Sequence, residues 1–195
     1  MIEDQDGETS ISWLKSLKRS LEVNQSDPHH RFVQLATVTK QGEPRNRTLV
    51  YRGLDEEGAV WLCTDRRSSK ADELIERGHV ELCWYFLKSR EQYRLQGGVK
   101  FILSNALREQ VWAQLSLSTR AQFHWPKPGE VLLPEDVLAV DQIDLESLRD
   151  APISPNFLLF KVVAGYVDYL SLGERHRRWI SVKSWKGWDC AEVTP

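Results

Sequence analysis

Apolar and polar residues alternate along many short stretches of this chain, and that alternation is typical of β-strands with one buried face. Polar turns such as QGEP and DEEG separate the first strand-like stretches, and a tight LKSRE connection joins two later ones. The strand-like stretches are 31–40, 45–53, 59–64, 79–86, 92–102, 156–165, 166–172, 177–182 and 188–193. We expect about eight strands from them.

Helical spacing of apolar residues occurs in three places. The apolar residues of 11–21 lie on one helical face, with Thr9 or Ser10 as the cap. A second pattern predicts a helix over 69–77 that ends before a glycine, and a third predicts a helix over 105–116. These helices are few and lie between the strands, so they are expected at the periphery.

Many strands with few helices predict a mainly β protein, an arrangement best satisfied by a closed or nearly closed antiparallel barrel. Gly97 and Gly98 interrupt one strand and indicate a bulge or sharp bend of the kind that barrels need. Residues 124–155 hold most of the prolines and an acidic patch, which predicts a surface excursion with one short helix. We expect disorder in the acidic residues 1–9 and a single domain over 10–195.

Length and composition restrict the class of function. The chain has 195 residues, 41% hydrophobic and 28% charged, with a net charge of −2, so we expect no nucleic-acid partner and only a local anion site. Since no apolar run has the length of a membrane span and MIEDQDGETS is unlike a signal peptide, we expect a cytoplasmic protein with no membrane partner. The scattered Cys63, Cys83 and Cys190 predict neither a disulfide framework nor a metal site.

The stretch WLCTDRRSSKADEL, residues 61–74, is a candidate anion site. Serine, arginine and lysine side chains gather here where a strand gives way to a helix, and the first N–H groups of a helix favour an anion. The alternative is a solvated cationic surface in which Ser68 or Ser69 only caps the helix. The glycine motifs of dinucleotide-binding and P-loop proteins do not occur.

Two further stretches are rich in arginine. In PRNRTLVYRG, residues 44–53, Arg45, Arg47 and Leu49 share one face of the predicted strand. ERHRRW, residues 174–179, precedes another strand. Either stretch can be merely solubilising, and an RNA contact is a minor alternative because the net charge is close to neutral.

The order of these stretches resembles the pyridoxamine 5′-phosphate oxidase group of FMN-binding split barrels. The resemblance is carried by RTLVYR, LCTDRRSSKADEL, CWYFLKSREQYRLQG, VWAQLSLSTRAQFHW and the C-terminal RHRR, and it extends from about Arg31 to Pro195. RAQFHWPKPG, residues 120–129, matches the branch described only as related to the oxidases. The resemblance implies a split barrel, FMN as the cofactor, and a homodimer with FMN at the interface.

The resemblance also implies which residues hold FMN. Arg47 and Lys70 would contact its phosphate, and Arg52 would lie beside the isoalloxazine ring. Ser69 stands where the family usually has an arginine and Arg67 is expected to compensate, so both are candidate phosphate ligands. The remaining implied contacts are Leu49, Cys63, Thr64, Gln92 and Arg178, the last from the other subunit. Trp84 and Trp112 are expected either at subunit contacts or in the core.

The residues implied to face the substrate depart from the family pattern. They are Arg52, Trp112, Ser116, Arg120 and Glu174. Thr119 is the alternative to Arg120 at the last of these positions on the helix. Ser116 is a neutral residue where the family has an arginine, so the bidentate phosphate ligand is missing unless Arg120 supplies the contact. Glu174 places a carboxylate where an anionic substrate needs a cation. His176 is retained as a catalytic candidate for proton transfer or substrate orientation, the alternative being a surface histidine.

Three functions remain open from the sequence. The first is an FMN-dependent oxidoreductase that acts on a small molecule and is not a true pyridoxamine 5′-phosphate oxidase. The second is a non-catalytic FMN carrier or sensor. The third is a barrel that binds another flat anionic ligand, such as haem or pyridoxal phosphate. The sequence does not separate the first two.

Overall fold

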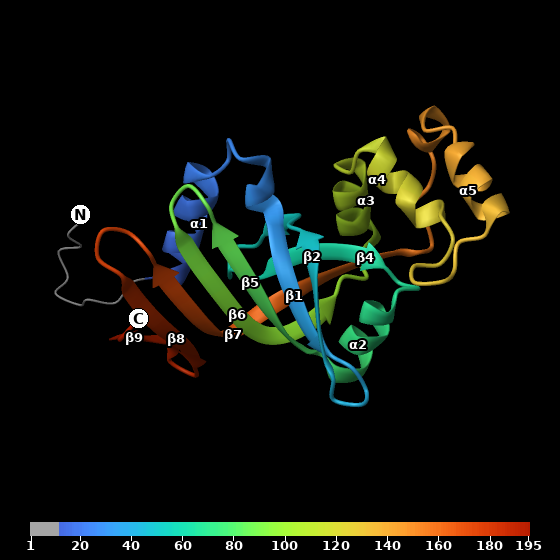
Figure 1. Cartoon of the computed structure of the whole chain (residues 1–195). Coiled ribbons are helices and arrows are strands. Elements are labelled where there is room, and N and C mark those ends of the chain that lie inside the picture. The colour runs from blue at the N-terminus through green and yellow to red at the C-terminus, as the bar shows by residue number, and fades with distance from the viewer. Residues whose placement is uncertain (1–11) are drawn as a thin grey trace.

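The computed structural model describes residues 12–195, and within them one antiparallel sheet of nine strands curls around a helix (Figure 1). The strands are β1 (Phe32–Val38), β2 (Pro44–Val50), β3 (Gly53–Leu54), β4 (Val60–Asp65), β5 (His79–Phe86), β6 (Glu91–Phe101), β7 (Phe157–Ser171), β8 (Arg177–Ser184) and β9 (Gly187–Val193). The α-helices are α1 (Trp13–Val23), α2 (Ser69–Arg77), α3 (Asn105–Ala113), α4 (Leu117–Ala121) and α5 (Pro134–Asp141). The mainly β, antiparallel prediction is confirmed.

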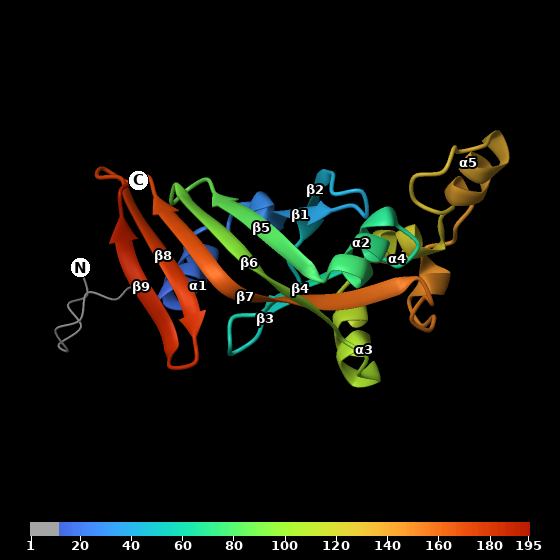
Figure 2. The same ribbon diagram turned by 90° about the horizontal axis from the view of Figure 1, so that it is seen from below.

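The strand order leaves the barrel open along one line. The order is β2-β1-β5-β6-β7-β4-β3, with β8 and β9 attached beside β7. Figure 2 shows β7 running the length of the sheet, paired first with β4 and then with β8 along the same edge. No backbone pairing joins β2 to β4 within residues 12–195, although the two strands lie close together. We call this unpaired line between β2 and β4 the seam.

One long strand replaces two predicted ones. The sequence predicted separate strands over 156–165 and 166–172, but β7 is continuous from Phe157 to Ser171. Gly165 is an extra residue in the ladder, because Gln96 pairs with Tyr166 and the next residue, Gly97, pairs with Ala164. The glycine therefore marks a β-bulge rather than the end of a strand.

The predicted irregularity at Gly97 is confirmed. The β6–β7 register shifts between Gln96 and Gly97. A Cβ atom at Gly97 would lie 2.0 Å from the carbonyl oxygen of Val163, so only glycine fits this close approach of two backbones. The bend lets the sheet curl instead of remaining flat.

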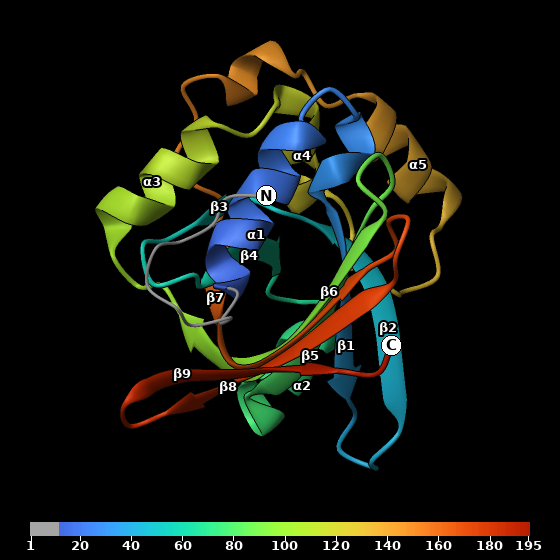
Figure 3. The same ribbon diagram turned by 90° about the vertical axis from the view of Figure 1, so that its left-hand side faces the viewer.

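The main core lies between α1 and the concave side of the sheet, as Figure 3 shows. Trp13 and Leu17 of α1 pack there against the strands, and Trp84 is fully buried among them, so Trp84 belongs to the core of the single chain. The residue that caps α1 is Ser12, whose side chain accepts from the backbone of Lys15. The proposed caps Thr9 and Ser10 lie outside the described residues, as does the predicted disorder of 1–9.

A second apolar cluster lies under α3, on the other side of β4 and β7. It contains Trp112, Phe123 and Phe157, whose rings lie 5.2–5.5 Å apart by centroid. The predicted single helix over 105–116 is divided here, because α3 ends at Ala113 and α4 begins at Leu117. The excursion over 124–155 holds α5, which confirms the predicted short helix. Within residues 12–195, no helix has the length and apolar character needed to cross a membrane.

Candidate functional site

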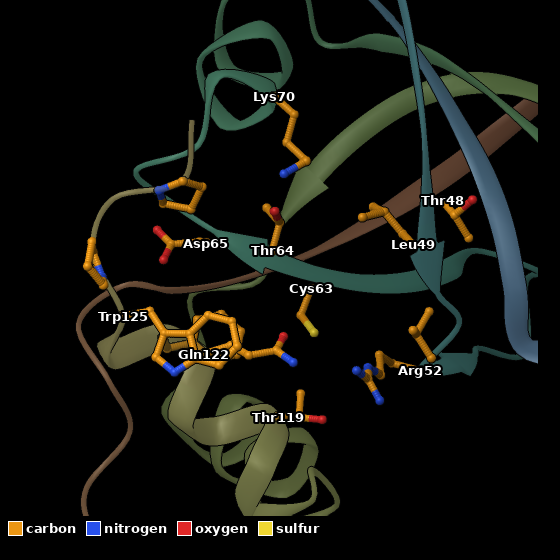
Figure 4. A pocket seen from close by; sticks show the side chains of 14 residues that line it. Thr48, Leu49, Arg52, Cys63, Thr64, Asp65, Lys70, Thr119, Gln122 and Trp125 are labelled. Carbon is orange, nitrogen blue, oxygen red and sulfur yellow. The ribbon is translucent and has the colours of Figure 1, made fainter. Parts of the chain in front are cut away.

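A cavity of about 380 Å³ lies at the seam, between the edges of β2 and β4 and the segment that follows α3 (Figure 4). Its lining residues are Thr48, Leu49, Val50, Arg52, Cys63, Thr64, Asp65, Lys70, Thr119, Gln122, Phe123, Trp125, Pro126 and Pro128. Five of the residues predicted to hold FMN are among them: Leu49, Arg52, Cys63, Thr64 and Lys70. The structure thus brings together stretches that are far apart in the sequence.

Lys70 is a half-buried cation without a protein partner. It stands in the first turn of α2, and Figure 4 shows its side chain extending over Thr64. Within residues 12–195 its ammonium makes no hydrogen bond or ion pair, and burial, followed by the charge of Arg47, lowers its pKa. No side chain caps α2, because the Ser68 hydroxyl donates to the carbonyl of Asp65. A free ammonium and an uncapped helix N-terminus together favour an anion.

Arg47 lies beside the cavity, held by a buried network. Its guanidinium donates to Glu73 Oε2 at 2.9 Å and to the Thr37 hydroxyl, which itself donates to Glu73 at 2.5 Å. Glu73 is only 8% exposed and Thr37 only 3%. The network fixes the direction of Arg47 next to Lys70, because a buried charge-assisted pair has few alternative geometries.

Arg67 and Ser69 do not line the cavity. Arg67 donates to both carboxylate oxygens of Asp65 and, at 3.0 Å, to the carbonyl of Trp125. Arg67 therefore connects the end of β4 to residues 122–128 and supports the cavity wall from behind. Ser69 is exposed at the first position of α2.

Arg52 lines the other end of the cavity. Its Nε is buried and has no partner within residues 12–195. The guanidinium lies beside the sulfur of Cys63, whose pKa is raised by burial, so this thiol is protonated at neutral pH. Figure 4 shows Arg52 with Cys63 above it and Thr119 and Gln122 across the cavity.

The other positions expected to clamp a substrate phosphate are occupied by structural contacts. Arg120 is 8% exposed, and its terminal nitrogens donate to the carbonyls of Leu148, Arg149 and Ala113 at 2.9–3.1 Å. Its guanidinium lies 5.7 Å from the ring centroid of Trp112, which is itself buried. Ser116 is the N-cap of α4. None of these three residues lines the cavity.

The remaining predicted residues lie away from the cavity, at the part of the sheet where β6 and β8 pair with the end of β7; Figures 1 and 2 show β8 there. Gln92 lies on β6, and Arg178 of β8 forms a bidentate pair with Asp168 at 2.7 and 2.9 Å. Glu174 and His176 are exposed in the loop between β7 and β8. A single chain therefore leaves the predicted site in two separate parts.

Sequence reasoning missed Gln122 and Trp125 in the wall that they form with Thr119, which was given only as an alternative to Arg120. The signal for these two residues was the stretch RAQFHWPKPG, which was interpreted only as a mark of family resemblance. It also missed Glu73, the inward-facing carboxylate of α2. Since Glu73 follows Lys70 by three residues, helical spacing places the two side chains on one face, and that spacing was the available signal.

Comparisons with known proteins agree with this geometry. A family model described as "Pyridoxamine 5'-phosphate oxidase, FMN-binding domain" matches residues 10–103. Pyridoxine/pyridoxamine 5′-phosphate oxidase 2 of Arabidopsis thaliana is 33% identical over 195 residues, which cover 94% of this chain and 96% of the plant protein.

Solved structures share the architecture. A pyridoxamine 5′-phosphate oxidase-related, FMN binding protein from Nostoc punctiforme superposes with a TM-score of 0.83 and 34% identity, covering 96% of this chain and all of that one. PhzG from Burkholderia lata, solved in complex with tetrahydrophenazine-1-carboxylic acid, has the same TM-score at 21% identity over 96% of this chain and 95% of its own, which shows the shared fold alone. The fold is the split barrel that the sequence predicted, and the chain belongs to the pyridoxamine 5′-phosphate oxidase-related family of FMN-binding proteins.

Proposed function

We propose that this chain binds FMN in the seam cavity, with the phosphate at Lys70 and Arg47 and the flavin beside Leu49, Cys63 and Arg52. The observation that carries the proposal is the half-buried Lys70 ammonium, which has no protein partner within residues 12–195 and stands at the uncapped start of α2. Burying a cation is costly unless a counter-charge accompanies it. A phosphate supplies that charge, and FMN is the ligand that the family model names.

The function that this site supports best is an FMN-dependent oxidoreductase acting on a small molecule. When bound, FMN supplies two-electron chemistry that amino-acid side chains lack. The residues of the chain bind and orient: Lys70 and Arg47 hold the phosphate, and the Arg67–Asp65 pair anchors Trp125 so that the wall keeps water away from the ring. His176 remains a candidate for proton transfer, from the second half of the site.

Pyridoxamine 5′-phosphate is expected to be a poor substrate. A phosphate monoester requires a cation at the helical side of the cavity, but Arg120 donates to three backbone carbonyls and Ser116 caps α4. Glu174 adds a negative charge from the other part of the site. We expect kcat/KM for pyridoxamine phosphate to be lower than that of an authentic oxidase by roughly several hundredfold, since losing a charged hydrogen bond costs a few kcal/mol.

The complete site requires a second copy of the chain. Gln92 and Arg178 lie far from the cavity of their own chain, so a two-fold pair would bring them to the partner's cavity. Asp168 pairs with Arg178 and also accepts from Arg94 at 3.3 Å, and these contacts fix the Arg178 guanidinium on the surface of the sheet. Light scattering of FMN-loaded protein should give the mass of a dimer. A monomer that still binds FMN tightly would refute the two-part site.

Absorption spectroscopy tests the proposed function directly. Purified protein, or protein incubated with FMN and then desalted, should carry the visible flavin bands, and candidate donors should bleach them under anaerobic conditions. Steady-state assays with pyridoxamine and pyridoxine phosphates then measure the expected deficit. A colourless protein that retains no FMN after incubation and desalting would overturn the proposal.

The second candidate is a non-catalytic FMN carrier or sensor. The observation that favours it is that the substrate-clamp positions serve structural contacts while the phosphate end of the cavity is intact. A carrier would bind FMN but leave its bands unbleached by nicotinamide, amine and alcohol donors. An oxidoreductase would be reduced by at least one donor and reoxidised by air.

A further inference from the structure

The end of the seam cavity away from Lys70 has its own set of polar groups. Arg52 comes from the chain just after β2, Cys63 from β4, and Thr119 and Gln122 from the helical segment that faces them. Figure 4 shows these four side chains converging on the same space, with Trp125 beside Gln122. We call this group of four the outer end of the cavity.

Among the described residues, Arg52 is the one cation that lines the outer end of the cavity. Lys70 and Arg47 lie at the phosphate end, and Arg67 is paired with Asp65. Arg120 donates to carbonyls and does not reach the cavity. The other outer-end groups are neutral, because Thr119 and Gln122 carry no charge and burial keeps the Cys63 thiol protonated.

We propose that the ligand of the outer end is a flat small molecule with a single carboxylate, which pairs with the Arg52 guanidinium while Gln122 and Thr119 hydrogen-bond the ring substituents. This inference rests on the proposed function, since it assigns the phosphate end to FMN. It names the substrate class of the same cavity: a monocarboxylic acid, not a phosphate monoester.

Charge and shape both lead to this class. A neutral ligand would leave the Arg52 guanidinium, which lines the cavity and donates to no protein oxygen within residues 12–195, without a counter-charge, and an uncompensated cation opposes binding. A phosphate dianion would bring two negative charges to a single guanidinium. A carboxylate matches the planar fork of an arginine. Trp125, Pro126 and Pro128 form a rigid wall, which favours a planar ring over a flexible chain.

The test uses three probes that share one ring and differ only in their head group: benzoate, benzamide and phenyl phosphate. Isothermal titration calorimetry of FMN-loaded protein, in which the phosphate end is occupied, measures each affinity without relying on the flavin signal. We expect benzoate to bind at least roughly tenfold more tightly than benzamide or phenyl phosphate, the range of one charge-assisted hydrogen bond. Arg52→Gln should abolish this preference.

Two further variants make the result interpretable. Arg45→Gln is the matched control, because Arg45 lies on the same stretch but is exposed and paired with Glu43; it should keep the full preference. Arg52→Lys keeps the charge without the planar fork, so a reduced preference for benzoate should remain even if Arg52→Gln does not fold.

The inference is overturned if phenyl phosphate binds as tightly as benzoate, if benzoate does not bind at about millimolar concentration, or if the preference survives in Arg52→Gln. It is also overturned if Arg52→Gln leaves benzoate binding to the FMN-loaded protein unaffected, since Arg52 would then contact the flavin alone. Failure of the proposed function has a different signature: FMN gives no heat in its own titration, whatever benzoate does.

Discussion

Arg52 and Arg120 lie on the two sides of the candidate site, and their surroundings are opposite. On the strand wall, formed by β2, β4 and the first turn of α2, the Arg52 guanidinium donates to no protein oxygen within residues 12–195. On the helical wall, formed by residues 112–128, two terminal nitrogens of Arg120 donate to three carbonyls and only its Nε lacks an acceptor. Lys70 of the strand wall is also without a hydrogen-bond or ion-pair partner in the described part of the chain.

This difference distinguishes an arginine that is available to a ligand from one that stabilises the fold. A buried guanidinium with its carbonyls in place stabilises the segment that folds around it, and nothing remains to attract a ligand. A cation left without an acceptor in a cavity destabilises the free protein and is compensated only when an anion arrives. The strand wall therefore has the features of a binding surface, whereas the helical wall has those of a structural element.

Removing Arg120 should have the largest effect on stability. Arg120→Met leaves three carbonyls without their donor and the ring of Trp112 without its cation, so we expect a loss of about 3 kcal/mol in the free energy of unfolding. For a chain of this size the melting temperature should fall by roughly 6–12 °C. Thermal unfolding monitored by circular dichroism measures it.

Arg45→Met is the control for this measurement, because it removes an exposed arginine. The affinity of folded Arg120→Met protein for FMN should be nearly unchanged. Normal stability combined with a collapse of ligand binding would place Arg120 in the cavity and reverse the assignment of the two walls.

Lys70→Ala should weaken FMN binding by roughly ten- to a hundredfold through loss of a charge-assisted hydrogen bond, with little effect on stability. Arg47→Ala should weaken it similarly and also destabilise the fold, because the buried Glu73 loses its cationic partner and keeps only the Thr37 hydroxyl. Fluorescence titrations with FMN and with riboflavin measure both effects. Riboflavin has no phosphate, so its affinity should not depend on Lys70; an equal loss for both ligands would contradict the phosphate assignment.

Local patterns in the sequence predicted the strand wall because its parts are local. The bounds of α2 follow from helical spacing between a serine pair and Gly78, which adopts the left-handed conformation that ends the helix. Leu49, Arg52, Cys63, Thr64 and Lys70 reach the cavity from stretches that strand alternation and one helix start had marked. Their assignment to a ligand, however, came from the family resemblance and not from these local patterns.

The helical wall could not be predicted in the same way. Whether Arg120 faces the cavity depends on carbonyls at 148 and 149, which return to it after an irregular excursion. No periodicity connects those positions. Gly165 shows the same limit, since its role as a bulge residue is determined by the register with β6 rather than by its neighbours in sequence.

Ser116 should contribute to stability and not to ligand binding. Its side chain accepts from the Thr119 backbone at the start of α4, so Ser116→Ala should cost about 1 kcal/mol in the free energy of unfolding. Ser116→Asp, which retains a good cap, should restore stability without changing affinity for FMN or for phenyl phosphate. If aspartate instead weakened anion binding sharply, Ser116 would face the ligand after all.

The smallest expected effect is a change of FMN affinity with pH, and it depends on the lowered pKa of Lys70. A bound phosphate favours the charged ammonium, so the pKa of Lys70 is higher in the complex than in the free protein. FMN affinity should therefore fall as the pH rises through the lowered pKa of Lys70 in the free protein, at a pH below the ordinary lysine range.

The stability of the FMN-free protein should change with pH in the opposite direction. The unfolded chain binds more protons than the folded chain in that interval, so the free energy of unfolding increases with pH there. Titrations between about pH 7 and pH 10 should show the decline for FMN but not for riboflavin, and Lys70→Met should remove it. Affinity for FMN that stays constant over this interval in the unsubstituted protein would mean that Lys70 does not contact the phosphate.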